Sequence, residues 1–247
     1  MIPIVSLANS LSFLVSIAIA VKLYFSMQSS KDPQFRYFFF CFLSLAVFFG
    51  IISFPGIVSE NGRFLDITNA ISIAFVMLGA LLFTIIPIKM FEWDKTRIIY
   101  IVVGGIIVVA APVIRFFGLG EMTPTVQGDF EFWLRPKNIY VTVAWILTGG
   151  FALFSMIFAG VIFIIYGIKY KTGGYVRIRS FILGTAVLLL GLSAAINYIL
   201  GNTPQVVPYL SSSLLAAFSL LLMSIGIFYR RKVTAVPKET GEPQNSA

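Results

Sequence analysis

The side chains that could carry out chemistry in this chain are few, and most of them are neutral hydrogen-bonding groups. The 247 residues include no histidine and a single cysteine, Cys41. Without imidazole, histidine metal ligands, histidine haem ligation and histidine acid–base catalysis are ruled out. The sequence also shows no paired carboxylates, no nucleophile beside a base and no residues at metal-ligand spacing. We therefore expect no enzymatic activity, no metal and no cofactor.

Six polar side chains are placed so that they could bind a ligand. These residues fall at similar depth in several long apolar segments, in the half that we assign below to the outer side of a membrane. They are Asn9, Asp66, Asn69, Arg115, Asn197 and Ser212. An amide or a charge that faces lipid costs several kcal/mol, so we expect these side chains to point into the protein. Two interpretations remain open. The residues form hydrogen bonds between helices, worth about 0.6 kcal/mol each, or they line a polar vestibule that opens outward and binds a ligand.

Arg115 is the only ionisable residue well inside an apolar segment. It lies roughly 26 Å beyond the start of that segment at Ile98, at about 1.5 Å per helical residue, and so close to the outer interface. Arg115 could extend to the lipid head groups, or it could face inward and pair with Asp66. In the second case we expect Arg115 to anchor an anionic group of the ligand, with Asp66 setting its rotamer.

Composition determines the elements that must position these residues. Hydrophobic residues make up 58% of the chain and charged residues only 11%, and the mean hydropathy is +0.94. A soluble domain carries about 25% charged residues, so this chain has too little polar surface for water and must use lipid as its solvent. The net charge of +8 comes from Lys and Arg at segment ends. The expected partners are therefore anionic lipid head groups, and nucleic acid is not expected.

Seven apolar segments are long enough to cross a hydrocarbon core of about 30 Å, which takes roughly 20 helical residues. They run approximately over Ile2–Phe25, Tyr37–Val58, Ile67–Met90, Ile98–Phe117, Ile139–Ile168, Ser180–Leu200 and Tyr209–Tyr229. The second is rich in Phe and would suit a buried strand in water, but in lipid only a helix satisfies its backbone. We predict an all-α membrane protein, a bundle of seven transmembrane helices over 1–232, followed by a disordered cytoplasmic tail over 233–247.

The positive charges predict how the bundle is oriented. Loops rich in Lys and Arg stay in the cytoplasm because cations are costly to translocate. The segment Lys169–Arg179 holds four cations and no acid between two apolar segments. With the N-terminus outside, fourteen of the eighteen Lys and Arg residues fall on the inner side, and five acidic residues fall on each side. The net charges are then +9 inside and −1 outside. We predict a multi-pass protein of the cell membrane, with its N-terminus outside and its C-terminus in the cytoplasm.

The longest outer connection, Gly118–Asn138, contains a short alternating pattern. Thr123–Val126 and Asp129–Leu134 flank Gln127-Gly128, and three apolar residues in the second run alternate with Glu and Trp. This alternation is typical of a small β-hairpin or an interfacial lid. An aromatic belt that rests on the head groups is the other interpretation, and both stay open.

Five features over residues 128–232 carry a family resemblance. They are Gly128–Trp133, Tyr140 at the start of a span, Arg177–Gly191, Asn197-Tyr198 and Pro208. In this order they resemble the seven-span input modules that are fused to bacterial and archaeal histidine kinases and cyclases. The resemblance implies a helical bundle with its N-terminus outside that senses an extracytoplasmic or membrane-borne ligand. The chain departs from that family because it has no kinase or cyclase domain, so its signal would need a separate partner protein.

Two functions of different classes are consistent with these observations. The first is a non-catalytic receptor-like or accessory signalling subunit, which transmits helix rearrangements to a protein partner at the cytoplasmic turns. The alternative is a passive transporter or channel for a small neutral or amphiphilic solute. Apolar packing beneath an outer polar vestibule would favour the first function, whereas a polar stripe through the inner half would favour the second.

Overall fold

The computed structural model describes residues 2–29, 34–169, 174–200 and 203–229, and these ranges contain seven helices long and apolar enough to cross a membrane. The helices are α1 (Ile4–Ser29), α2 (Gln34–Ser53) with its short continuation α3 (Pro55–Val58), α4 (Gly62–Met90), α5 (Asp94–Phe117), α6 (Ile139–Lys169), α7 (Gly174–Leu200) and α8 (Val206–Phe228). The prediction of an all-α, seven-helix membrane protein is confirmed. The predicted tail over 233–247 lies outside the described residues.

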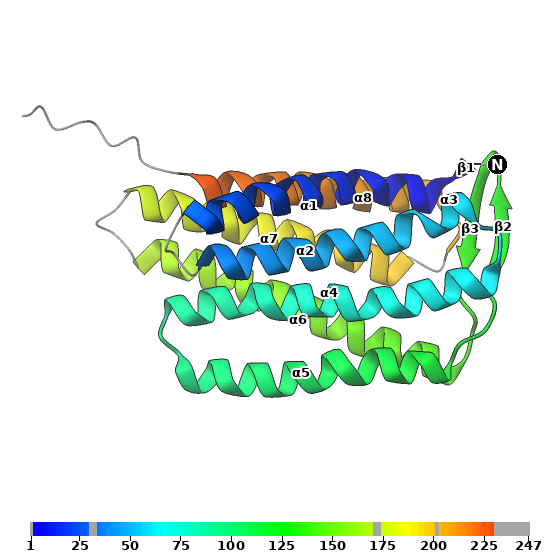
Figure 1. The fold of residues 1–247 in the computed structure, drawn as a ribbon, viewed down its shortest axis with the longest axis horizontal. Coiled ribbons are helices and arrows are strands. Elements are labelled where there is room, and N and C mark those ends of the chain that lie inside the picture. The colour runs from blue at the N-terminus through cyan, green and yellow to red at the C-terminus, as the bar shows by residue number, and fades with distance from the viewer. Residues whose placement is uncertain (1, 30–33, 170–173, 201–202, 230–247) are drawn as a thin grey trace, which may run out of the picture.

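Six of the seven helices form a closed ring, and the seventh lies outside it. Around the ring, α1 packs on α2, α2 on α4, α4 on α6, α6 on α7 and α7 on α8, and α8 returns to α1. Helix α5 packs on α4 and α6 from outside the ring (Figure 1). Its outward face carries exposed aliphatic side chains, which suits a surface that meets lipid. The interior of the ring is therefore enclosed by α1, α2, α4, α6, α7 and α8.

The ring is tightened where α6 and α7 meet through two glycines. A Cβ atom added to Gly160 would lie 3.1 Å from the carbonyl oxygen of Gly184, and one added to Gly184 would lie 2.9 Å from the carbonyl oxygen of Gly160. Small residues at such contacts let two helix backbones approach closely in a membrane. Any larger residue at either position would push the two helices apart.

Helices α2, α4, α5, α7 and α8 begin earlier than the apolar segments do, because their first turns remain helical. Helix α4 begins at Gly62, whereas hydropathy placed the start of its segment at Ile67. Asn61 caps this extra turn, since its side-chain oxygen accepts hydrogen bonds from the backbone N–H groups of Arg63 and Phe64 (both 3.0 Å). Capping and backbone hydrogen bonds thus continue the helix beyond the apolar residues.

The second predicted span has a short irregularity near the end that faces the sheet. Helix α2 ends at Ser53 and the single turn α3 begins at Pro55, while Phe54 between them keeps a helical backbone (φ −68°, ψ −43°). Pro55 has no backbone N–H to donate to the preceding turn. The two pieces form one apolar span over Gln34–Val58, so the predicted span over Tyr37–Val58 is confirmed.

A three-stranded sheet covers the end of the bundle at which the chain begins (Figure 1). Strands β2 (Thr123–Gln127) and β3 (Phe130–Leu134) form an antiparallel hairpin, and β1 (Ile2–Pro3) pairs in parallel with β3. The turn is Gly128-Asp129, one residue later than predicted, with Gly128 at φ 62°. The hairpin interpretation is confirmed. The prediction that Ile2 opens the first helix is wrong, because its N–H instead donates to the carbonyl oxygen of Asp129 (3.0 Å).

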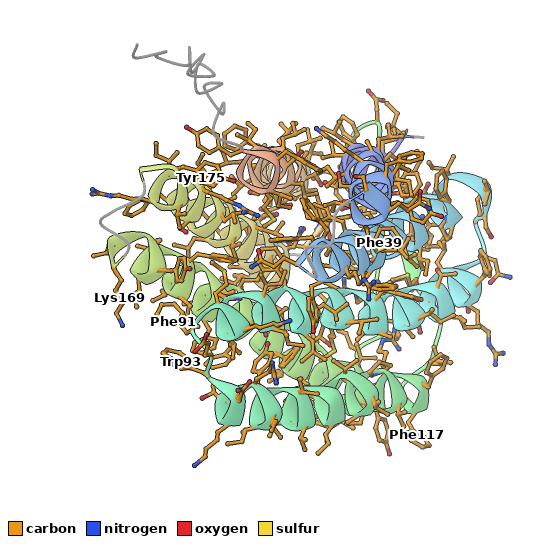
Figure 2. All side chains as sticks on the ribbon, turned by 60° about the vertical axis from the view of Figure 1, so that its left-hand side comes forward. Phe39, Phe91, Trp93, Phe117, Lys169 and Tyr175 are labelled. Carbon is orange, nitrogen blue, oxygen red and sulfur yellow. The ribbon has the colours of Figure 1, made fainter. Side chains whose placement is uncertain are left out.

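Lysines at the end of the bundle opposite the sheet lie over aromatic rings. The ammonium of Lys22 is 4.0 Å from the centroid of Phe228, and that of Lys169 is 5.3 Å from the centroid of Phe91. Figure 2 turns this end toward the reader and shows Lys169, Phe91 and Trp93 near one another. Residues 170–173 of the predicted cytoplasmic turn lie outside the described residues. Eight of the twelve described Lys and Arg residues belong to this end, and Arg63, Arg115, Arg135 and Lys137 belong to the sheet end. The assignment of the lysine-rich end to the cytoplasm stays a prediction.

Candidate ligand-binding site

A cavity of about 230 Å³ lies inside the helix ring, at the end that the sheet covers. Every helix of the ring contributes to its wall, and so do α3, β3 and the residues that flank the hairpin. The residues that line the cavity near the sheet differ in polarity from those that line it further along the helices. Polar or aromatic residues near the sheet include Asn9, Asn69, Trp133, Arg135, Asn197 and Tyr209, whereas Leu45, Met156, Leu190 and Ala216 lie deeper. The cavity is therefore amphipathic.

Three of the six predicted binding residues, Asn9, Asn69 and Asn197, line this cavity from α1, α4 and α7. The Nδ2 atom of Asn9 donates to the carbonyl oxygen of Val5 in its own helix (2.8 Å). At Asn69 it is the backbone carbonyl, rather than the side-chain amide, that accepts the Ser72 hydroxyl (2.7 Å). Three amides from three separate helices thus converge on one space, although the sequence separates the first and the last by almost the whole chain.

Asp66 and Arg115 do not line the cavity, because their side chains form a buried ion pair with each other. Their side chains are 0% and 1% exposed, and an Arg115 Nη atom donates to a carboxylate oxygen of Asp66. Arg115 also donates to the carbonyl oxygen of Gly118 (3.2 Å), and Asp66 accepts from the backbone N–H of Gly120 (3.0 Å). The pair fastens the start of α4 to the end of α5 and to the segment that leads into β2. The predicted pairing of an inward-facing Arg115 with Asp66 is confirmed, and the alternative that Arg115 extends to head groups is wrong. Because neither side chain lines the cavity, Arg115 is not placed to anchor a ligand there.

Ser212 does not line the cavity but contacts Asn197, which does. It is fully buried in α8, and its hydroxyl donates to Oδ1 of Asn197 (3.0 Å). The Ser212 carbonyl accepts the hydroxyl of Ser193 from α7 (2.7 Å). Ser212 is therefore a positioning residue that orients the Asn197 amide. The Ser212–Asn197 contact is thus a hydrogen bond between two helices, as the first interpretation expects, and it also orients a side chain that lines the cavity.

The charged residue that does reach the cavity is Arg135, which directly follows β3. Its guanidinium carbon lies 3.7 Å from the centroid of the Trp145 ring, a cation–π arrangement. Tyr198 stacks on the same indole with centroids 5.1 Å apart and planes inclined by 13°. Gly149 gives this stack its room, since a Cβ atom there would overlap the Tyr198 ring. Arg135 after β3, Trp145 of α6 and Tyr198 of α7 thereby form one stack at the cavity wall.

Arg135 keeps its charge at neutral pH. Burial lowers the pKa of Arg135 to about 10, and nearby Tyr209, Arg115 and Asp66 modify it to a smaller extent. The guanidinium is therefore protonated throughout the physiological range. Among the described residues that line the cavity, Arg135 is the only charged one, and none is an Asp or a Glu.

Trp133 reaches the cavity from β3. Its neighbour Phe132 is buried in a separate small cluster with Ile4 and Tyr209. The Nε1 atom of Trp133 is buried and has no hydrogen-bond partner among the described residues. A buried donor without an acceptor costs roughly 1–3 kcal/mol. An acceptor placed in the cavity would remove this cost.

Packed aromatic rings lie in the helix ring beyond the deep lining residues Leu45 and Met156, in the same hydrophobic cluster. The rings of Phe38 and Phe83, and those of Phe83 and Phe163, have centroids 6.0 Å apart, and Phe42 beside them is fully buried. A second cavity of about 140 Å³ lies beyond these rings, between α2, α4, α6 and α7. Its wall includes Arg179, whose Nε atom donates to the carbonyl oxygen of Gly226 (3.1 Å). The two cavities occupy opposite ends of the same ring.

Sequence reasoning missed the aromatic part of the site. Arg135 lay outside the apolar segments and entered only as one charge among many, and Trp133 was placed in an alternating segment without a direction. Trp145 and Tyr198 lie within about two turns of helix ends, where aromatic residues commonly form an interfacial belt. Their pairing across 53 residues could not be read from local pattern.

Comparison with known proteins gives no family assignment. No protein family model matches the chain, and no curated protein matches its sequence. Within the part of the chain that the structure describes, no three His, Cys, Asp or Glu side chains group so that they could hold a metal ion. The cavity itself offers a small molecule hydrogen-bonding groups, one cation and apolar contacts.

Proposed function

We propose that this protein is a non-catalytic receptor-like or accessory signalling subunit of the cell membrane, which binds a small molecule in the cavity beneath the sheet. One observation carries the proposal. The cavity collects three amides, an indole N–H and a guanidinium at its sheet end, and packed Phe rings lie beyond its deep lining residues. Such a combination of an apolar pocket with a few convergent polar groups is the usual form of a small-molecule site.

The outward-facing orientation is part of this proposal. The described cations concentrate at the end opposite the sheet, and the positive-inside rule then puts the sheet and the cavity outside. A ligand would therefore arrive from the extracytoplasmic side or from the outer leaflet. The resemblance to input modules of histidine kinases and cyclases supports the same direction of signalling.

The ring gives a ligand a way to act at the other end. Because all six ring helices line the cavity and span the membrane, a ligand that contacts them differently in two arrangements shifts the balance between these arrangements. The shift would be read at the helix ends that carry Lys89, Lys169 and Arg179 by a protein partner with complementary charge. Anionic lipid head groups are the other expected partners of these cations.

Passive transport of a small solute is the second candidate, and one observation favours it. The cavity of about 140 Å³ beyond the Phe rings lies in the same ring, so movement of these rings would join the two spaces. Against this, the rings of Phe38, Phe83 and Phe163 present no polar group to a passing solute. We therefore place signalling first.

A comparison of two α7 variants tests the ligand site. Ala194 lines the cavity, so Ala194→Phe should fill it, whereas Leu192 is 52% exposed on the same helix and Leu192→Phe should not. Each protein in nanodiscs is incubated with a small-molecule extract of its expression host, washed, and analysed by mass spectrometry. We expect a small molecule that is retained by wild type and Leu192→Phe but not by Ala194→Phe. Equal retention by all three would contradict the site.

Vesicle measurements separate signalling from transport. The retained molecule is enclosed in liposomes with or without the protein, and its release is followed over time. A receptor-like subunit should leave release unchanged. Faster release with wild type that is abolished by Ala194→Phe would instead establish transport through the cavity.

A further inference from the structure

Two groups on the wall of the cavity near the sheet can only donate hydrogen bonds. They are the Arg135 guanidinium and the Trp133 indole N–H, and Trp133 Nε1 has no partner among the described residues. The hydroxyls of Thr68, Ser72 and Thr148 donate to carbonyl oxygens of their own helices, those of Leu65 (2.9 Å), Asn69 (2.7 Å) and Ala144 (2.7 Å), so they offer no donor to a ligand. An acceptor on the ligand would supply the partner that the Trp133 N–H lacks.

Charge points in the same direction. Arg135 contributes a positive charge to a wall that contains no carboxylate among the described residues. Asp66 is the acid whose charge acts on Arg135, but its oxygens already accept from Arg115 and from the N–H of Gly120. A hydrogen bond to an ionised group is about twice as strong as one between neutral groups. An anion on the ligand would thus gain most from this wall.

The shape of the guanidinium selects the kind of anion. Because one face of Arg135 lies on the Trp145 ring, a ligand in the cavity would meet the guanidinium at its edge. This planar fork fits the two oxygens of a carboxylate, or two oxygens of a sulfonate, side by side. The indole N–H of Trp133 is a further donor to the same group from β3. Both donors come from the outer segment and not from a transmembrane helix.

Size limits the rest of the ligand. A volume of about 230 Å³ holds roughly eight water molecules at ~30 Å³ each, or an organic molecule of about a dozen more closely packed atoms. This is below the roughly 300–1,000 Å³ of pockets for drug-sized ligands. Below the polar groups the wall is apolar, with Leu45, Phe48, Met156 and Leu190. An aromatic ring or a short alkyl chain fits this part, whereas a long acyl chain does not.

From these observations we propose that the ligand is a small organic monoanion, a carboxylate or sulfonate on an apolar body, with about twelve non-hydrogen atoms or fewer. The anionic group binds Arg135 and Trp133, and the apolar body lies toward Met156 and Leu190. This assignment rests on the proposed function and names its ligand class. The small volume assigns the source to the aqueous phase and not to the acyl chains of the bilayer.

Binding of a matched set of probes tests the assignment. Thermal unfolding of the purified full chain in nanodiscs is measured against increasing benzoate, benzenesulfonate, hexanoate and palmitate, with benzamide and benzyl alcohol as neutral analogues. The variants are Arg135→Gln, Trp133→Phe and Arg63→Gln. Arg63 is exposed at the same end of the molecule, so its variant removes the same charge without touching the cavity. Arg135→Lys keeps the charge, in case Arg135→Gln fails to fold.

We expect saturable stabilisation by benzoate, benzenesulfonate and hexanoate, and none by the neutral analogues. Arg135→Gln should weaken the affinity by about tenfold or more, the loss expected when a charge-assisted hydrogen bond is removed. Trp133→Phe and Arg135→Lys should weaken it less, and Arg63→Gln by less than about twofold.

Other results would overturn the assignment in different ways. Stabilisation by benzamide equal to that by benzoate, or unchanged benzoate affinity in Arg135→Gln, would refute the anion while leaving a ligand-binding cavity in place. Tighter binding of palmitate than of hexanoate would refute the size limit and move the source to the bilayer. If no probe binds and Ala194→Phe retains the same small molecules as wild type, the assignment and the proposed function both fail.

Discussion

Breaking the buried ion pair of Asp66 and Arg115, at the sheet end of the bundle, should destabilise the protein far more than breaking an exposed ion pair. In Arg115→Gln, the Asp66 carboxylate stays buried without its cation, and the Gly118 carbonyl loses a donor. Removal of one partner from a buried pair costs about 3–5 kcal/mol. For a chain of this size the melting temperature should fall by about 6–20 °C, at roughly 2–4 °C per kcal/mol. The change is structural, so the folded fraction should bind benzoate with unchanged affinity.

The chain provides its own control for this prediction. Arg97 and Asp94 form an ion pair of 2.9 Å with side chains 31% and 69% exposed, and such pairs contribute about 0–1 kcal/mol. Unfolding is followed by circular dichroism in detergent for Arg115→Gln, Asp66→Asn, the double variant and Arg97→Gln. The double variant should lose less stability than the sum of the two single variants. A melting temperature of Arg115→Gln that falls no further than that of Arg97→Gln would refute the ion pair as a fastening of α4 to α5.

The remaining predictions concern orientation, packing and pH. In a cysteine-free background, Gln127→Cys in the hairpin should react with an impermeant thiol reagent added to intact cells and Lys95→Cys should not; the reverse pattern would invert the topology. Gly149→Ala should cost about 1–3 kcal/mol by overpacking the aromatic stack, whereas Gly150→Ala, which meets nothing within 4 Å, should be neutral or stabilising; equal unfolding temperatures would contradict the stack. Because the pKa of Arg135 is about 10, benzenesulfonate affinity should be constant from about pH 6 to 9 and fall above about 10, where the guanidinium loses its proton; a fall near neutral pH would point to another group.

The seven helices could be predicted because each is specified locally. An apolar run such as Ile139–Ile168 must satisfy its backbone in lipid and has only the helix available. The convergence of Asn9, Asn69 and Asn197 could also be anticipated from a single cost, that of turning an amide to lipid. Depth along a helix comes from counting residues, and direction comes from excluding the lipid side. Neither step needs knowledge of which helices are neighbours.

The exchange of roles between Arg115 and Arg135 could not be predicted, because it depends on contacts between distant segments. Arg115 has a carboxylate within reach only because α4 and α5 pack side by side. Arg135 enters the cavity only because β3 is held at the end of the bundle by β1, a strand of two residues at the far end of the sequence. Short parallel pairing of this kind leaves no periodic signal in the sequence. Hydropathy treats both arginines as costs to be placed near an interface. Similar depth indicated Asp66 as a partner of Arg115, whereas no pattern in the sequence indicated a partner for Arg135.

Tryptophan fluorescence tests the central claim, that the cavity beneath the sheet is a ligand site, most directly. The chain has three tryptophans, and two of them, Trp133 and Trp145, line the cavity, whereas Trp93 lies at the opposite end. In Trp93→Phe all indole emission therefore reports the cavity. Titration with para-nitrobenzoate, an anion of the proposed size that quenches indole emission, should give saturable quenching that is lost when Ala194→Phe is added. Quenching that rises linearly with concentration, and equally in the presence of Ala194→Phe, would contradict the claim.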